Sequence, residues 1–192
     1  SVASILASRL GAIPLAAHQL VLQIASFTFM MPLGVSSATA VLVSQNLGAK
    51  NLPQVKYSGW LGFAYAVLIM SVNSFLLYYF ANPILMTFTQ ELDVIAASKQ
   101  ILIIVAFFQI FDGLQVVGAG AMRGTSNTKI ALVANLAGHW VISIPLGIFL
   151  CFSIGWQLPG LWTGLATGLF TVSAILLTMW VRWCRKNQLV LS

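Results

Sequence analysis

Long apolar segments fill most of the chain, and only short polar breaks separate them. Charged side chains make up 6% of the 192 residues, whereas about a quarter of the residues in an ordinary soluble domain are charged. A soluble fold needs polar groups to cover its surface. A run of about 20 apolar residues is instead the length that spans a lipid bilayer as a helix. The sequence therefore predicts an all-α integral membrane protein in direct contact with the lipid bilayer.

The polar and glycine-containing breaks predict where the membrane-spanning helices begin and end. Gly48 suits a helix end, and Pro53 suits the first turn of the helix that follows. Pro32 and Pro145 lie within predicted helices and are candidate bend points. The pattern predicts helices over residues 15–47, 54–80, 93–122, 128–152 and 159–183, with a turn of interfacial helix over 84–88.

The first six residues are apolar or small, and no signal-peptide pattern accompanies them. We interpret residues 1–6 as the end of a helix whose start is missing. We therefore expect residues 1–192 to form a single lobe of a longer membrane protein.

The basic residues are distributed unevenly between the two ends of the predicted helices. One end carries only Arg9 and Lys99. Cytoplasmic connections of membrane proteins carry an excess of Lys and Arg, which predicts a cytoplasmic C-terminus for this multi-pass chain, in the plasma membrane or bacterial inner membrane. The basic side chains do not cluster with aromatic ones on one polar face, so we expect no nucleic-acid partner. The end opposite Arg9 and Lys99, which we predict to be cytoplasmic, carries Lys50, Lys56, Arg123, Lys129, Arg182, Arg185 and Lys186.

Asp112 is an acidic residue deep within a predicted span. A charged side chain at the centre of a bilayer costs at least ~2.5 kcal/mol on insertion scales. A helix tolerates that cost when the carboxyl group faces a cavity, a partner or a bound cation. A low dielectric favours the neutral acid, while a bound cation favours the charged form. Asp112 is therefore our candidate coupling group for a proton or Na⁺, and a structural hydrogen bond between helices is the alternative.

Two neighbours of Asp112 lie on the same face of its predicted helix. Gln115 follows it by three residues, and Phe108 precedes it by four. A polar face with an aromatic neighbour suits a cavity that binds an aromatic cation. A hydrogen bond from Gln115 to another helix explains that residue equally well.

The first predicted helix carries a stripe of polar residues in an apolar setting. Gln19, Gln23 and Ser26 share one face, and Met30 continues the stripe. A water-facing cavity wall explains this pattern, and interhelical hydrogen bonds worth about 0.6 kcal/mol each are the alternative. We expect His18 near the outer interface, where its ring is easily solvated.

The fourth predicted helix places Asn135 and His139 four residues apart on one face. The pair is a candidate lining of the cavity that Asp112 faces. A packed, hydrogen-bonded histidine is the more common situation in a membrane protein. Both residues are therefore candidates for substrate contact, with structural packing as the alternative.

Small and aromatic residues near the helix ends have structural explanations. Gly160, Gly164 and Gly168 repeat every four residues, which allows close helix packing. Five tryptophans near predicted helix ends suit an interfacial aromatic belt: Trp60, Trp156, Trp162, Trp180 and Trp183.

The sequence lacks the usual patterns of an enzyme or a metalloprotein. No C-x-x-C, H-E-x-x-H, G-x-S-x-G or phosphate-loop motif is present. Cys151 and Cys184 fall at opposite membrane faces, about 30 Å apart, so we expect free thiols. We expect no enzymatic activity, no organic cofactor and no metal, apart from Na⁺ at Asp112.

Several stretches, taken in order, resemble the C-terminal half of the multidrug and toxic compound extrusion (MATE) transporters. Each stretch is short, but their order and spacing along nearly the whole chain are specific. The stretches are LAAHQ (15–19), MPLGVSSAT (31–39), VSQNLGA (43–49), FDGLQVVG (111–118), MRG (122–124), NLAGHW (135–140) and PLG (145–147).

This resemblance implies twelve helices in two six-helix lobes around a central cavity. The chain would hold the end of helix seven and all of helices eight to twelve, with the N-terminal lobe as its missing partner. MATE transporters export organic cations and amphipathic drugs in exchange for Na⁺ or H⁺. Their C-lobe cation site uses an acid on helix ten, the position where Asp112 stands.

Two positions depart from the family pattern. Many members carry an acid where Asn127 stands, and many carry Tyr where His139 stands. The resemblance implies an antiporter that works by alternating access. The alternative is a lipid-linked oligosaccharide flippase of the same wider superfamily, for which we would expect a more cationic cavity.

Overall fold

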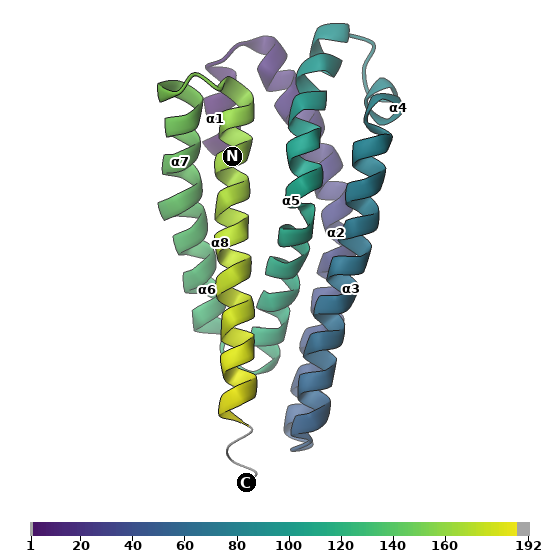
Figure 1. The fold of residues 1–192 in the computed structure, drawn as a ribbon, viewed down its shortest axis with the longest axis vertical. Coiled ribbons are helices and arrows are strands. Elements are labelled where there is room, and N and C mark those ends of the chain that lie inside the picture. Colours follow the sequence, from purple (N-terminus) through teal and green to yellow (C-terminus); the bar gives the residue numbers. More distant parts are fainter. Residues whose placement is uncertain (1, 188–192) are drawn as a thin grey trace.

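The computed structural model describes residues 2–187, and helices make up nearly all of that part (Figure 1). Ser1 and the last five residues, which our prediction of a single lobe over 1–192 also includes, lie outside the described residues. The described residues contain no strand. The helical segments in chain order are α1 (Val2–Ser8), α2 (Ala12–Gly48), α3 (Leu52–Tyr79), α4 (Ala81–Met86), α5 (Leu92–Gly124), α6 (Thr128–Leu136), η1 (Ala137–Ser143), α7 (Ile144–Ile148), η2 (Phe149–Ser153) and α8 (Gln157–Lys186).

Five helical stretches among the described residues are long and apolar enough to cross a membrane. They agree with the predicted spans to within a few residues at each end. Asn51 accepts a hydrogen bond from the Gln54 backbone N–H at the start of α3, and Pro53 occupies the first turn. This side-chain cap supports the predicted break between α2 and α3. The spans are Ala12–Gly48, Leu52–Tyr79, Leu92–Gly124, Ala131–Ser153 and Gln157–Lys186.

The predicted interfacial turn exists, but it lies three residues earlier than expected. Residues Ala81–Met86 form α4, so Asn82 and Pro83 lie within this short helix and do not interrupt it. A proline is tolerated near the start of a helix because the first backbone N–H groups have no intrahelical acceptor. The shift does not affect the number of spans.

The fourth span is not a regular α-helix. Two π-helical segments, η1 and η2, flank the short α7. Pro145 lies in the first turn of α7, directly after η1. π-helical turns inside α-helices are rare and occur frequently at functional sites. The sequence predicted a bend at this proline but not the wider turns on either side of it.

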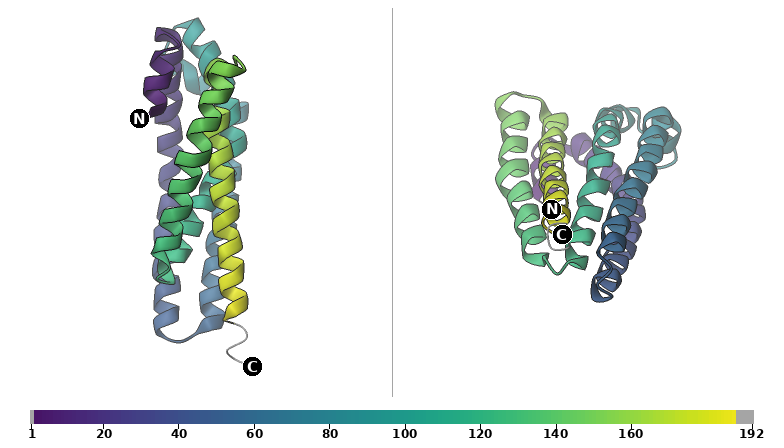
Figure 2. Two further views of the ribbon diagram at one scale, coloured as in Figure 1. Left: turned by 90° about the vertical axis from the view of Figure 1, so that its left-hand side faces the viewer. Right: turned by 60° about the horizontal axis from the view of Figure 1, so that its bottom comes forward.

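Helix α5 forms the centre of the bundle and packs against α2, α3 and α8 (Figures 1 and 2). Two separate clusters of buried apolar residues hold it there. The first includes Ile101 and Leu102, and the second includes Val117 and Ala121. The segment of α5 between these clusters carries the polar side chains Gln109, Asp112 and Gln115. A polar level therefore interrupts the apolar core partway along the bundle.

The predicted glycine stripe does bring α8 close to the fourth span. A Cβ atom on Gly164 would overlap the backbone of Gly147, and one on Gly168 would overlap the Ser143 side chain. Small residues allow this close approach. The contact sets the position of η1 and α7 relative to α8.

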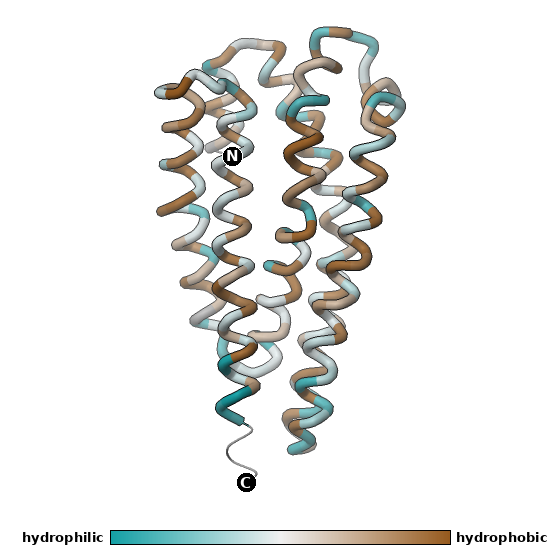
Figure 3. Tube along the Cα trace, in the orientation of Figure 1, coloured by the Kyte–Doolittle hydropathy of each residue, from teal (hydrophilic) through white to brown (hydrophobic). Residues whose placement is uncertain are grey.

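The basic residues gather at one end of the bundle, as the sequence predicts. The α2–α3 connection, the α5–α6 connection and the C-terminal end of α8 all lie at this end (Figure 1). Hydrophilic residues are most visible at the end of α8 (Figure 3). Cys151 and Cys184 are both buried free thiols.

Candidate functional site

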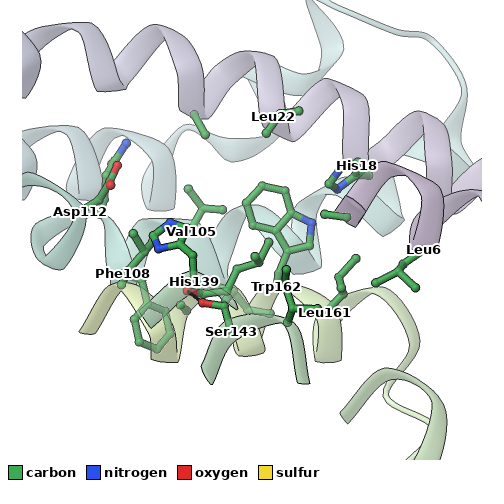
Figure 4. A pocket seen from close by; sticks show the side chains of 18 of the residues that line it. Leu6, His18, Leu22, Val105, Phe108, Asp112, His139, Ser143, Leu161 and Trp162 are labelled. Carbon is green, nitrogen blue, oxygen red and sulfur yellow. Dashed lines mark hydrogen bonds between the residues drawn. The ribbon is translucent and has the colours of Figure 1, made fainter. Parts of the chain in front are cut away.

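A pocket of about 410 Å³ opens between α1, α2, α5, the fourth span and α8 (Figure 4). This volume lies within the range of sites that bind small molecules, about 300–1,000 Å³. Most of its lining is apolar. The polar or ionisable side chains that line it are His18, Gln109, Asp112, His139 and Ser143.

Asp112 lines this pocket and is half-buried. Its carboxyl group has no hydrogen bond or ion pair with any residue that the structure describes. The alternative that we considered, a hydrogen bond to a neighbouring helix, is therefore not seen. Gly113, the next residue, lies against Met70 of α3. Asp112 therefore lines the pocket while the adjacent residue of α5 packs against α3.

Phe108 and His139 line the pocket near Asp112 (Figure 4). Phe108 comes from the preceding turn of α5, and His139 comes from η1. His139 Nδ1 is buried without a hydrogen-bond partner among the described residues. An aromatic face and an unpaired ring nitrogen beside an acid suit a cavity for an aromatic cation.

Gln109 is a pocket residue that the sequence interpretation did not select. It is only 4% exposed, and its Nε2 donates a hydrogen bond to Thr28 Oγ1 of α2. Its Oε1 has no hydrogen-bond partner among the described residues. Leaving such a buried acceptor unpaired costs about 1–3 kcal/mol. The available signal in the sequence was its position three residues before Asp112, one helical turn away on the same face.

His18 is buried inside the bundle, so the expectation that its ring is easily solvated is wrong. It is 1% exposed, lines the pocket and packs against the ring of Trp162, 5.5 Å away between centroids. Its Nε2 lies 3.3 Å from Ser4 Oγ of α1. Trp162 is also buried, as is Trp180 further along α8, so neither belongs to an interfacial belt. Contact between α1, α2 and α8 covers the rings of His18 and Trp162, which helix periodicity alone does not reveal.

Gln115 and Asn135 form a pair away from the pocket. Gln115 Nε2 donates to Asn135 Oδ1, and Asn135 Nδ2 donates to the Ala131 carbonyl at 2.8 Å. Neither side chain lines the pocket. His139 lines the pocket and Asn135 does not, so this pocket does not bring together the two residues that were expected to line one cavity.

The polar stripe on α2 also lies outside this pocket. Gln19, Gln23 and Met30 are exposed on the surface of the described bundle. Their face of α2 is opposite the face that carries the buried residues Ala17, Val21 and Thr28. The stripe and Asp112 therefore belong to two different surfaces of this part of the protein.

A bundle of membrane-length helices around a pocket with an unpaired, deeply placed acid defines the class of membrane transport proteins. Comparison with known families agrees with this class. The profile of the MatE family matches residues 2–149, and the chain therefore belongs to the MATE family of multi-pass membrane transporters.

Proteins with similar sequences are named as multidrug resistance proteins. The chain is 37% identical over 185 residues to the probable multidrug resistance protein NorM of Mesorhizobium japonicum. It is 36% identical over 172 residues to the multidrug resistance protein NorM of Burkholderia vietnamiensis. These alignments include 94% and 87% of the chain, but only 40% and 37% of the respective relatives. The chain thus spans about two fifths of the length of the curated relatives that it matches.

Solved structures of MATE transporters share the fold. The eukaryotic transporter AtDTX14 aligns with a TM-score of 0.83 and 22% identity, over 91% of this chain and 40% of that one. An inward-facing multidrug resistance MATE transporter aligns with a TM-score of 0.84 and 15% identity, over 91% of this chain and 39% of that one. The prediction of an all-α MATE lobe is therefore confirmed.

Proposed function

We propose that this chain is the C-terminal lobe of a secondary active efflux antiporter. The complete protein exports organic cations or amphipathic drugs in exchange for Na⁺ or H⁺ by alternating access. Its partners are the N-terminal lobe, the bilayer and a small-molecule substrate. It has no catalytic residues and needs no organic cofactor. The relatives named NorM are multidrug resistance proteins, which supports this class of substrate.

The observation that carries this proposal is the unpaired Asp112 carboxyl group in the pocket. An ionisable group at membrane depth needs a partner to offset its desolvation. No such partner is found among the described residues, and a mobile cation or proton supplies one. Substrate and coupling ion then compete for one negative charge, either directly or through movement of the helices.

The exposed stripe of Gln19, Gln23 and Met30 fits a second part of this proposal. These residues are exposed on the surface of this lobe when it is considered without the N-terminal lobe. In the complete protein, we assign this face of α2 to the central cavity between the two lobes. There, amide groups and a flexible methionine would contact an amphipathic substrate.

The flippase alternative receives less support from the pocket. A pyrophosphate-linked substrate calls for Lys or Arg in the cavity. The lining residues among the described part of the chain include neither, and the basic residues gather at one end of the bundle.

The decisive experiment compares Asp112→Asn with wild type in the complete protein. Membrane vesicles are loaded with a fluorescent organic cation, and its efflux is followed after a Na⁺ or pH gradient is imposed. We expect Asp112→Asn to reduce gradient-driven efflux to the level of vesicles without the transporter, while expression is unchanged. An amide of similar size preserves packing but does not become negatively charged.

Asp93→Asn is the matched control, because it makes the same change on the same helix at an exposed position. We expect it to retain efflux. Normal coupled efflux from Asp112→Asn would contradict the proposal.

A further inference from the structure

Gln109 and Asp112 lie three residues apart on α5, and both line the pocket. Residues with this spacing are neighbours on one helix face. Gln109 is nine-tenths or more buried, whereas Asp112 is half-buried. An amide and a carboxyl group therefore stand side by side at the wall of one cavity.

The contact between Gln109 and Thr28 determines which way the amide points. The Thr28 hydroxyl donates its hydrogen to the Ala25 carbonyl at 3.0 Å. Because a hydroxyl has one hydrogen, Thr28 Oγ1 can only accept the second hydrogen bond, and it accepts from the Gln109 amide nitrogen. The amide oxygen must then point away from Thr28.

The Gln109 oxygen is left without a donor. None of the described residues provides a hydrogen bond to Oε1. The other titratable groups that face the pocket are His139 from η1 and His18 from α2. Neither histidine bonds to Gln109. Among the described residues, the ring of His18 bonds only to Ser4, and the ring of His139 forms no hydrogen bond. A buried acceptor of this kind is costly unless something binds to it.

We propose that Gln109 Oε1 is a second oxygen ligand for the ion that binds at Asp112. The inference rests on the proposed function, because it requires an ion at Asp112. A carbonyl oxygen and a carboxylate suit Na⁺, which takes oxygen ligands as other hard cations do. The same oxygen would accept the O–H of Asp112 when the acid is protonated. In both cases one positively polarised atom lies between the two side chains.

A purely structural function for Gln109 is the competing explanation. The hydrogen bond to Thr28 joins α5 to α2, and this contact alone could account for a buried glutamine. The two explanations differ in which atom matters. A structural function needs only the amide nitrogen, while the ligand function needs the oxygen.

Two variants of the complete protein separate these functions. Gln109→Met has a similar length and removes both the nitrogen and the oxygen. Thr28→Val removes the same interhelical hydrogen bond but leaves the Gln109 oxygen in place. Efflux of a fluorescent organic cation is measured against external Na⁺ at fixed pH, and against pH without Na⁺.

For a Na⁺-driven protein, we expect Gln109→Met to raise the Na⁺ concentration at half-maximal efflux roughly tenfold, the lower end of the cost of removing a supporting group at a metal site. For a proton-driven protein, the half-maximal point moves towards lower pH, because the protonated acid loses its acceptor. Thr28→Val should change either quantity less than twofold. Gln109→Glu keeps an oxygen at this position and should bind Na⁺ at least as well as wild type; it decides the matter if Gln109→Met does not fold.

Three outcomes would overturn the inference. The first is an unchanged ion dependence in Gln109→Met, and the second is an equal shift in Thr28→Val. The third is a loss of ion affinity in Gln109→Glu as large as that in Gln109→Met. In each case, loss of efflux in Asp112→Asn would leave the proposed function in place. Normal efflux in Asp112→Asn would instead contradict the proposed function itself.

Discussion

Two glutamine side chains on α5 have different surroundings in this lobe. The amide of Gln115 bonds to Asn135 and joins α5 to α6, away from the pocket. The oxygen of each glutamine has no hydrogen-bond partner among the described residues, but Gln109, six residues earlier, lines the pocket and Gln115 does not. Because the two residues lie on different sides of α5, Gln115 joins two helices, whereas we propose that Gln109 binds an ion.

The amide pair makes a testable contribution to stability. We expect Gln115→Leu to destabilise the complete protein by about 1–3 kcal/mol, because the Asn135 oxygen loses its donor. The double variant Gln115→Leu/Asn135→Leu should lose less than the sum of the two single variants. Thermal unfolding of the purified protein in detergent measures this.

The ion dependence of efflux should stay within twofold of wild type in Gln115→Leu. A larger change would place Gln115 in the ion site and would contradict its assignment as a packing residue.

At the scale of elements, the fourth span and α8 determine the shape of the pocket. His139 and Ser143 come from η1, and η1 is held against α8 by contacts at Gly164 and Gly168. The π-helical turns of η1 are wider than α-helical turns, and this changes which side chains of the fourth span face α8. The position of η1 on α8 therefore affects the pocket directly, although the glycines do not line it.

We expect Gly164→Ala to push α7 and α8 apart, because the added Cβ would overlap Gly147. Overpacking of this kind typically costs about 1–3 kcal/mol. Fluorescence-detected size-exclusion chromatography after heating should show a lower melting temperature, and coupled efflux should fall with it.

Gly48→Ala is the control for that variant, since no neighbouring atom lies within 4 Å of the added Cβ. It should melt at or above the wild-type temperature. Equal melting temperatures for the two variants would show that the Gly147–Gly164 contact tolerates a separation of the helices.

At the scale of the whole molecule, the charge distribution gives the bundle a direction. The end that carries the α2–α3 connection is basic, and the end that carries α4 holds Glu91 and Asp93 as well as Arg9 and Lys99. The excess of basic residues predicts that the first end is cytoplasmic.

We expect Lys50→Cys to be protected from a membrane-impermeant thiol reagent added to intact cells, and Gln90→Cys to react with it. Both positions are exposed, whereas Cys151 and Cys184 are buried and give a low background. Labelling of Lys50→Cys in intact cells would reverse the predicted orientation.

The sequence by itself determined the membrane class, the spans and the position of Asp112 within one of them. Apolar length and charge are properties of each segment, and they do not depend on which helices meet. Helix periodicity also placed Phe108 on the face of Asp112, and both residues line the pocket.

Only the tertiary structure decided which face meets which neighbour. Helix period relates residues on one helix, but packing determines that Gln109 meets Thr28, that Gln115 meets Asn135 and that His18 is covered by Trp162. The π-helical turns of the fourth span depend on local register, which the apolar pattern does not report. The pocket exists because several helices from distant parts of the chain enclose it, and so its lining could not be read from any one of them.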